Sequence, residues 1–171
     1  RTTDQRETVD ALVPAVLDPD HLVRNAAAYA LADADVSRRA VTKALLTAAD
    51  DEVRAVRIQA AWALRSARLD SLSQADRMSV ESAFGEWTDA TALAAEEPEA
   101  QHNLGLFLSE RGDRAGAEAA YRRAIAIEPS SIAPRHNLAM LLVADGRVAE
   151  AAAELESLVA IDERFAPAWY A

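Results

Sequence analysis

A three-residue sequence, His102-Asn103-Leu104, recurs 34 residues later as His136-Asn137-Leu138. The same spacing separates three further pairs: Gly112 and Gly146, Ala117 and Ala151, and Ile127 and Ile161. A fixed period of this length is typical of stacked helical hairpins, in which each unit buries its apolar face only against its neighbours. Such arrays bind other chains far more often than they catalyse reactions.

The residues between these echoes predict two helices per period. In helical geometry Leu104 and Leu108 share one face. Gly112 breaks the chain after them, because glycine adopts the left-handed, helix-ending conformation at little cost. Pro129 closes the hairpin, since proline cannot continue a helix interior. The next period repeats the arrangement around Gly146.

This pattern resembles the tetratricopeptide repeat, a helical hairpin with small residues at set positions and a proline near its end. Residues 98–131 would form one unit and 132–165 a second, and a third would begin at Ala166. The chain departs from the family's pattern at three positions: Gln101 replaces the usual Trp, Ala139 replaces Gly, and Glu163 replaces Pro.

The first half has a period of 33 residues, in which the segment Val23–Leu31 recurs as Val56–Leu64. An acidic turn precedes each copy, and aspartate at a helix start accepts amide hydrogen bonds that the helix leaves unpaired. This half resembles the HEAT repeat. We expect Arg24 and Arg57 to pair with turn carboxylates of adjoining repeats.

We therefore predict an all-α fold, a right-handed α-α superhelix of HEAT-like hairpins (1–70), an adaptor helix (71–97) and tetratricopeptide repeats (98–171), the third of them truncated. Apolar periodicity near 3.6 residues predicts nine helices and no strand. Their expected ranges are 5–17, 20–33, 36–49, 51–67, 73–96, 98–111, 114–127, 132–145 and 148–161.

Net charge and residue composition exclude several classes of partner and site. The net charge is −10, which argues against the clustered basic face of a nucleic-acid-binding protein and against anionic membrane surfaces. The chain has no cysteine, so thiolate metal sites and cysteine nucleophiles are excluded. Lys43 is the only lysine beside many arginines, a bias that suggests a bacterial genome.

The first helix of each tetratricopeptide unit would line the groove of the superhelix. Residues spaced along one face of these helices are the candidate partner-binding residues: Glu99, His102, Leu106, Ser109, Ala133, His136, Met140 and Val143. A metal site shared by His102 and His136 is disfavoured, because adjacent helices lie about 8–10 Å apart. A carboxylate clamp built on Asn103 and Asn137 lacks its cationic part. The acidic turns lack the oxygen spacing of a calcium loop.

These observations predict a non-catalytic scaffold that binds a protein or peptide, without cofactor or metal. HEAT-like units followed by tetratricopeptide repeats also resemble the C-terminal regions of some bacterial multihaem c-type cytochromes, which would imply a periplasmic parent protein. No Cys-x-x-Cys-His motif is present, so no haem role passes to any residue here. The alternative is a regulatory or substrate-recruiting module of a cytosolic enzyme.

The ends of the chain suggest a piece of a larger protein, because it begins with Arg1 and stops just after the helix-start pattern at Trp169 and Tyr170. An unfinished third repeat would leave apolar surface on 148–161 without its cover. We expect that surface to pair with a second copy or with a following repeat.

The change Ala117→Leu should destabilise the fold. A small residue at this position lets the two helices of one hairpin touch, and overpacking such a contact costs about 1–3 kcal/mol. Chemical denaturation of the purified variant measures the loss. An unchanged unfolding midpoint would show that Ala117 does not lie at a helix contact.

Overall fold

The computed structural model describes residues 3–36 and 38–161, with side chains from residue 7 onward. These residues form nine α-helices and one short 3-10 helix, and the described part contains no strand. The prediction of an all-α protein is therefore confirmed. The chain divides into two compact units, residues 1–90 (unit 1) and 91–171 (unit 2), and each is described by itself.

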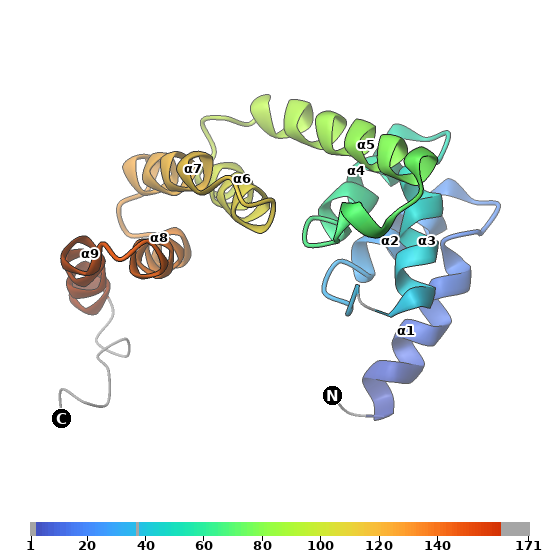
Figure 1. Cartoon of the computed structure of the whole chain (residues 1–171), viewed down its shortest axis with the longest axis horizontal. Helices are drawn as coiled ribbons and strands as arrows, with labels where there is room; N and C mark the ends of the chain where they lie inside the picture. The colour runs from blue at the N-terminus through green and yellow to red at the C-terminus, as the bar shows by residue number, and fades with distance from the viewer. Residues whose placement is uncertain (1–2, 37, 162–171) are drawn as a thin grey trace. The chain divides into compact units, whose positions relative to one another are not determined.

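Unit 1 is built from two helical hairpins and a longer helix (Figure 1). Helix α1 packs against α2 and α3, while α4 packs against α2 and α3. The bounds are α1 Thr3–Ala15, α2 His21–Ala30, α3 Arg39–Ala49, α4 Arg54–Ala63, a 3-10 helix η1 Leu69–Ser71, and α5 Gln74–Ala92, whose last two residues lie past the boundary of the unit.

Alanine makes the close packing of α2 on α4 possible. Ala27 and Ala28 of α2 are at most 2% exposed, and Ala60 and Ala61 of α4 are completely buried. Leu31 and Leu64 are also completely buried. Within the sequence echo between Val23–Leu31 and Val56–Leu64, the paired alanines and the final leucine are thus core residues in both copies.

Helix α5 closes unit 1 through aromatic stacking. The rings of Trp62 and Trp87 lie 5.5 Å apart between centroids with an interplanar angle of 17°. The guanidinium of Arg65 lies 4.3 Å from the Trp62 ring centroid. Val80 and Ala83 of α5 are completely buried. Ser73 directly precedes the first residue of this helix and caps it, because its hydroxyl oxygen accepts the Asp76 N–H at 3.1 Å.

Unit 2 consists of two hairpins, α6 Pro98–Glu110 with α7 Arg114–Ile127, and α8 Ile132–Ala144 with α9 Val148–Ile161. Each hairpin turns at a glycine in the left-handed region, with φ +82° at Gly112 and +76° at Gly146. Helix α7 also packs against α8 of the next hairpin, and α6 contacts α8. The predicted breaks at Gly112 and Gly146 are confirmed.

The core of unit 2 joins the two hairpins rather than lying within either one. Its buried members come from three places, α7, α8 and the start of α9: Ala117, Tyr121, Leu138, Leu141, Leu142 and Ala151. Ala117 is completely buried, as its role at a helix contact requires.

Several predicted helix ends are corrected. Helix α7 and α9 have the predicted ranges, whereas α4 starts at Arg54 instead of 51 and ends at Ala63 instead of 67. The carboxylate of Asp51 accepts the Val53 N–H at 2.8 Å, which holds the preceding turn in a non-helical conformation. Helix α2 ends at Ala30 instead of 33, and α5 at Ala92 instead of 96. The short helix η1 was not predicted.

The remaining helices differ from their predicted ranges by one to three residues. Helix α1 covers 3–15 instead of 5–17, α3 begins at Arg39 instead of 36, and α6 and α8 each end one residue early. The third repeat predicted from Ala166 lies outside the described residues. The division at 70/71 and 97/98 and a continuous superhelix over both units stay predictions.

The change Gly105→Ala should destabilise unit 2 by about 1–3 kcal/mol. A β-carbon at Gly105 would overlap the ring atoms Cδ1 and Cε1 of Tyr121, whose side chain is buried and cannot retreat. Gly85→Ala is the matched control, because nothing lies within 4 Å of a β-carbon there and the site is helical. We expect the control to stabilise α5 by about 0.5–1 kcal/mol. Equal effects in denaturant titrations would contradict the proposed fit between Gly105 and Tyr121.

Candidate functional site

Unit 2 contains a pocket where α6, α7 and α8 meet. Its volume is about 290 Å³. Eight residues line it: Leu106 and Ser109 from α6, Arg114 and Tyr121 from α7, and Asn137, Met140, Leu141 and Ala144 from α8. Apolar and polar side chains line it in similar proportion, with Leu106, Met140, Leu141 and Ala144 supplying the apolar part.

Local sequence explains how these side chains come together. Leu106 and Ser109 are three residues apart on α6, and Met140 and Ala144 are four apart on α8, so each pair shares one helix face. The buried ring of Tyr121 lies between them and takes the space left by Gly105. Burial, with a smaller contribution from Glu110, raises the pKa of Tyr121 to about 12, so its hydroxyl is protonated at neutral pH.

Three of the eight predicted groove residues line this pocket, namely Leu106, Ser109 and Met140. Val143 is 47% exposed on the same helix as Met140, which is 44% exposed. The pocket lining does not include the other four: Glu99, His102, Ala133 and His136. Of these, His102 is half-buried and the other three are exposed. Whether any of the eight contacts a partner stays a prediction.

The predicted groove residues did not include five of the lining residues: Arg114, Tyr121, Asn137, Leu141 and Ala144. Of these, Asn137 was considered only as part of a carboxylate clamp. Tyr121 and Leu141 carry no signal beyond that of core residues. Arg114 follows the Gly112 break directly, and its position at the start of α7 points it towards the next hairpin. There it forms an ion pair with Asp145 and donates to the Ala144 carbonyl at 3.4 Å.

A hydrogen bond between histidine and asparagine joins the two hairpins next to the pocket. The side-chain amide of Asn137 donates to Nε2 of His102 over 2.8 Å, which requires that nitrogen to be unprotonated. Burial lowers the pKa of His102, although nearby Glu99 acts in the opposite direction. The His102 ring centroid lies 6.1 Å from that of Tyr121. Burial and this hydrogen bond therefore favour the neutral form of His102, which contributes to the packing between the hairpins.

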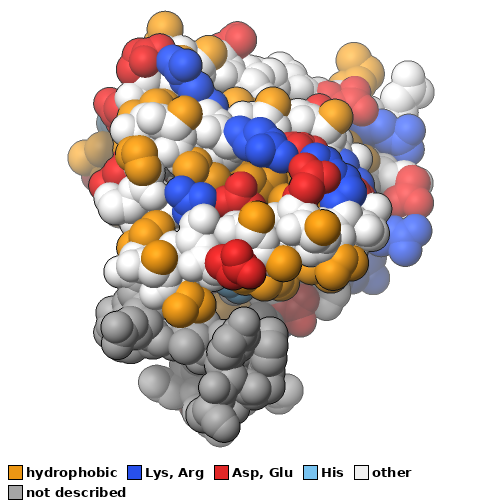
Figure 2. Space-filling model, turned by 90° about the vertical axis from the view of Figure 1, so that its left-hand side faces the viewer, with side chains coloured by type: hydrophobic (Ala, Val, Ile, Leu, Met, Phe, Trp, Pro, Cys, Tyr) orange, Lys and Arg blue, Asp and Glu red, His pale blue; other side chains and the backbone are white. Residues whose placement is uncertain are grey.

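Ion pairs occupy several arginines of unit 2. Arg147 of the second hairpin binds Glu118 of α7 at 2.6 Å and so joins the two hairpins, whereas Arg135 of α8 binds Glu154 of α9 at 2.6 Å within the second hairpin. Figure 2 shows basic and acidic side chains next to one another on one face of the molecule, with hydrophobic side chains between them. Paired arginines are poorly placed to bind phosphates, in agreement with the acidic composition.

The first acidic turn of unit 1 caps a helix, whereas Val53, the N-cap of α4 after the second acidic turn, makes no side-chain capping hydrogen bond. Asp20 accepts the Leu22 N–H at 2.8 Å and is the N-cap of α2. Within the part of the chain that the structure describes, no group of three His, Asp or Glu side chains could hold a metal ion. No helix among those residues is long and apolar enough to cross a membrane.

Comparison with known proteins identifies one family. Residues 108–171 match the model of the tetratricopeptide repeat. No curated protein and no solved structure matches the chain. The match covers the region of α7 to α9 and agrees with helices packed in pairs. It suggests a protein–protein interaction module, and no catalytic family was found. The comparisons give no support to the HEAT-like resemblance of residues 1–70, to the cytochrome resemblance, or to the bacterial and fragment assignments.

The depressed pKa of His102 predicts a specific loss of stability in acid. In the unfolded chain the His102 side chain takes up a proton near pH 6.5, whereas in the folded protein its pKa is lower and it takes up the proton only at lower pH. The stability that neutral His102 contributes is therefore fully present above pH 6.5. It is lost as the pH falls through the pKa of His102 in the folded protein. Urea titrations at several pH values should show this loss in the parent chain and a smaller loss in His102→Gln.

His136→Gln is the matched control, because His136 holds the equivalent place in the next hairpin but is exposed. It should leave the pH dependence of the parent unchanged. If His102→Gln retains the full pH dependence of the parent, His102 is not the group responsible.

Proposed function

We propose that the protein is a non-catalytic binding module whose unit 2 holds a protein or peptide segment in the groove along α6 and α8. The observation that carries this proposal is the pocket of about 290 Å³ beside Met140 and Leu106. Tetratricopeptide repeats commonly bind protein partners, and residues 108–171 match that family.

The chemistry of the pocket favours an aliphatic anchor side chain from the partner. Leu106, Leu141 and Ala144 supply apolar walls, and the flexible thioether of Met140 adapts to different shapes. Ser109 and Asn137 provide polar groups that can bind a peptide backbone. Exposed Val143 extends the apolar surface beyond the pocket.

Exposed acidic residues on α6 add a charge preference. Glu99 in the first turn of α6 and Glu110 at its end are both exposed. The neighbouring Arg114 is already paired with Asp145. A partner with basic residues flanking the aliphatic anchor therefore complements this surface, with faster association at low salt.

The two methionines of the chain, Met78 and Met140, give a direct test. Peptides are selected from a random library on the purified protein and titrated against protein with ¹³C-labelled methionine methyl groups. Binding in the groove should shift the Met140 signal and leave Met78, which is 62% exposed on α5 of unit 1, unchanged.

Two variants complete the experiment. Met140→Glu should weaken peptide binding by at least about tenfold, since it places a charge in a pocket built for an apolar group. Met78→Glu is the matched control and should bind the peptides as the parent does. Peptides that shift Met78 alone, or that bind Met140→Glu with unchanged affinity, would show that the groove is not the binding site.

A further inference from the structure

Two arginines of unit 1 make the same set of contacts one period apart. Arg24 Nη1 donates to the carbonyls of Asp18 and Pro19 at 2.9 and 3.1 Å. Arg57 Nη1 donates to the carbonyls of Asp51 and Glu52 at 2.7 and 3.1 Å. Each arginine therefore clamps the turn that precedes its own helix, and its remaining donors face the next element.

Those remaining donors bind a carboxylate from the following element. Arg24 binds Asp51 through Nε at 2.6 Å and Nη2 at 3.0 Å, and both side chains are about 90% buried, with exposed fractions of 11% and 9%. Arg57 binds Glu86 of α5 through Nε and Nη2 at 2.8–3.1 Å. The sequence-based pairing with turn carboxylates thus holds for Arg24, whereas the partner of Arg57 lies within a helix.

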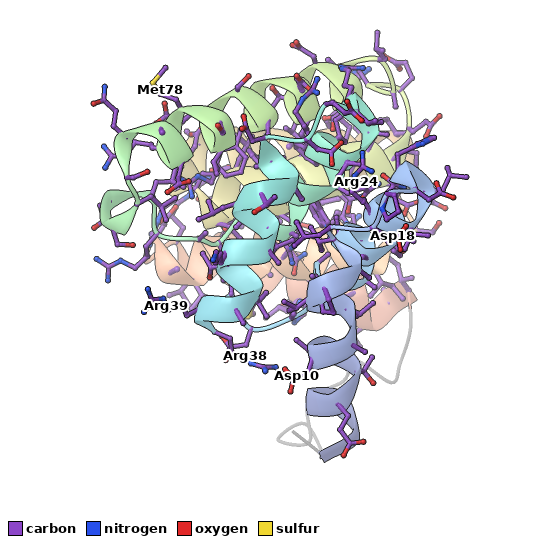
Figure 3. The ribbon with its side chains drawn as sticks, turned by 90° about the vertical axis from the view of Figure 1, so that its right-hand side faces the viewer. Asp10, Asp18, Arg24, Arg38, Arg39 and Met78 are labelled. Carbon is purple, nitrogen blue, oxygen red and sulfur yellow. The ribbon has the colours of Figure 1, made fainter. Side chains whose placement is uncertain are left out.

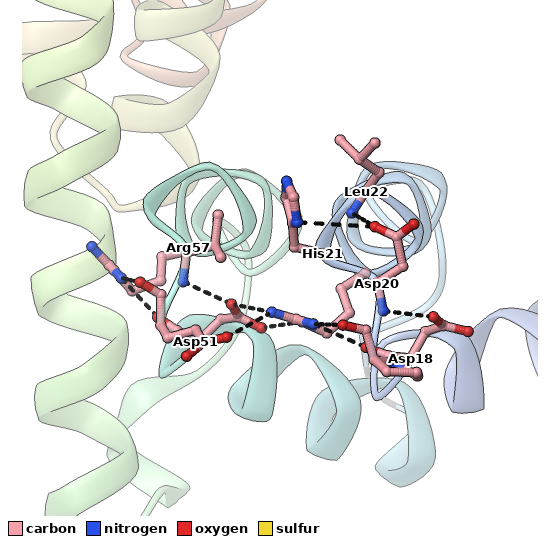
Figure 4. A network of polar contacts seen from close by, with 10 residues as sticks. Asp18, Asp20, His21, Leu22, Asp51 and Arg57 are labelled. Carbon is pink, nitrogen blue, oxygen red and sulfur yellow. Dashed lines mark hydrogen bonds and ion pairs between the residues drawn. The ribbon is translucent and has the colours of Figure 1, made fainter.

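Figure 4 shows the resulting row of alternating charges, which ends at Asp18. Asp18 stands 33 residues before Asp51 and has the same local geometry, since each carboxylate accepts an N–H two residues ahead at 2.8 Å. Asp51 also receives an arginine from the preceding hairpin. Among the described residues, no cation forms an ion pair with Asp18. The carboxylate lies at the end of unit 1 formed by α1 and α2 (Figure 3).

Apolar residues around Asp18 are exposed where their equivalents are covered. Val23 is 40% exposed, whereas Val56, one period later, is completely buried. Ala11 is exposed, whereas Ala44 is 7% exposed. In both comparisons the residue type and the position in the repeat are identical. The exposed fractions differ because α1 and α2 cover α3 and α4, whereas nothing in the described chain covers α1 and α2. Leu17 and Leu22 add exposed apolar surface at the same end.

We propose that this end of unit 1, defined by Ala11, Leu17, Asp18, Leu22 and Val23, is a docking surface for a further helical hairpin that presents an arginine to Asp18. The occupant's chemistry follows from the internal repeat: the hairpin α1–α2 covers the equivalent surface of α3–α4 and supplies Arg24 to Asp51. A symmetric pairing of two copies through this end is disfavoured, because it brings the two Asp18 carboxylates together without a cation.

The test adds such a hairpin. A second copy of residues 4–36 is placed directly before residue 4, which preserves the 33-residue period across the junction. The added Arg24 then faces the original Asp18. We expect the extended chain to unfold at higher temperature than the parent. Asp18→Asn in the original repeat should lower the midpoint of the extended chain by more than that of the parent. In the parent, asparagine keeps the oxygen that accepts the Asp20 N–H and removes only the electrostatic attraction between Asp18 and Arg24.

Arg24→Gln in the added copy should also lower the midpoint, and by more than Asp18→Asn, because it also removes the hydrogen bonds to the carbonyls of its own turn. The two changes together should cost less than the sum of their separate effects. Asp51→Asn in the parent is the positive control, because it breaks the pair that is already formed. An extended chain that is no more stable, or an Asp18→Asn effect of equal size in both chains, would overturn the proposal.

A second experiment measures directly whether the added hairpin covers residue 23. The chain has no cysteine, so Val23→Cys introduces a single thiol. Its labelling should be fast in the parent and should slow in the extended chain to the rate of Val56→Cys, which is protected in both. Unchanged labelling of Val23→Cys would contradict docking at this end. Concentration-dependent dimerisation of the parent that Val23→Lys abolishes would also overturn the proposal, since the occupant would then be a second copy.

Discussion

The ring of Tyr121 occupies the space that a side chain at residue 105 would fill, and unit 2 depends on this contact. Gly105 leaves room for the ring, and the ring in turn packs beside His102 and forms part of the pocket. Protein interiors are packed too closely to absorb an added methyl group without movement. The same small residue therefore sets the distance between α6 and α7 and the shape of the candidate site.

A second constraint acts between hairpins. No single hairpin of this length can bury its apolar face alone, so each relies on its neighbour, and polar contacts fix the register. In unit 2 the Arg147–Glu118 ion pair and the hydrogen bond from Asn137 to His102 link one hairpin to the next. In unit 1 the Arg24–Asp51 pair has the same role. Guanidinium groups suit this task because they bind a carboxylate and backbone carbonyls at once.

The two proposed surfaces differ in what they would bind. The pocket of unit 2 is concave, has its polar hydrogen-bonding groups beside apolar walls, and fits one anchor side chain of a partner. The end of unit 1 around Asp18 is equivalent to the surface of α3–α4, which α1–α2 already covers. The Asp18 carboxylate there would bind an arginine. Binding at the first surface concerns recognition of a segment, whereas docking at the second would extend a stack of helices.

Much of the architecture was readable from the sequence. The 34-residue echo placed the turns at Gly112 and Gly146, because only glycine takes a positive φ there without strain, and the ranges of α7 and α9 followed from it. The early ends of α2 and α4 were not predictable in the same way, because apolar periodicity continues past the last helical residue. Side-chain contacts such as that of Asp51 with the Val53 N–H decide where a turn gives way to a helix.

The candidate site was only partly predictable. Helical spacing was enough to select Leu106, Ser109 and Met140, since residues three or four apart share a face. In the sequence, Tyr121 and Leu141 cannot be distinguished from ordinary core residues. Arg114 lies on α7, whereas the predicted groove residues lie on α6 and α8. Sequence alone determined which residues repeat and which face each helix offers. Tertiary structure decided which of those faces meet and which of two identical residues, Val23 or Val56, is left uncovered, because burial depends on the neighbour that a position receives in space.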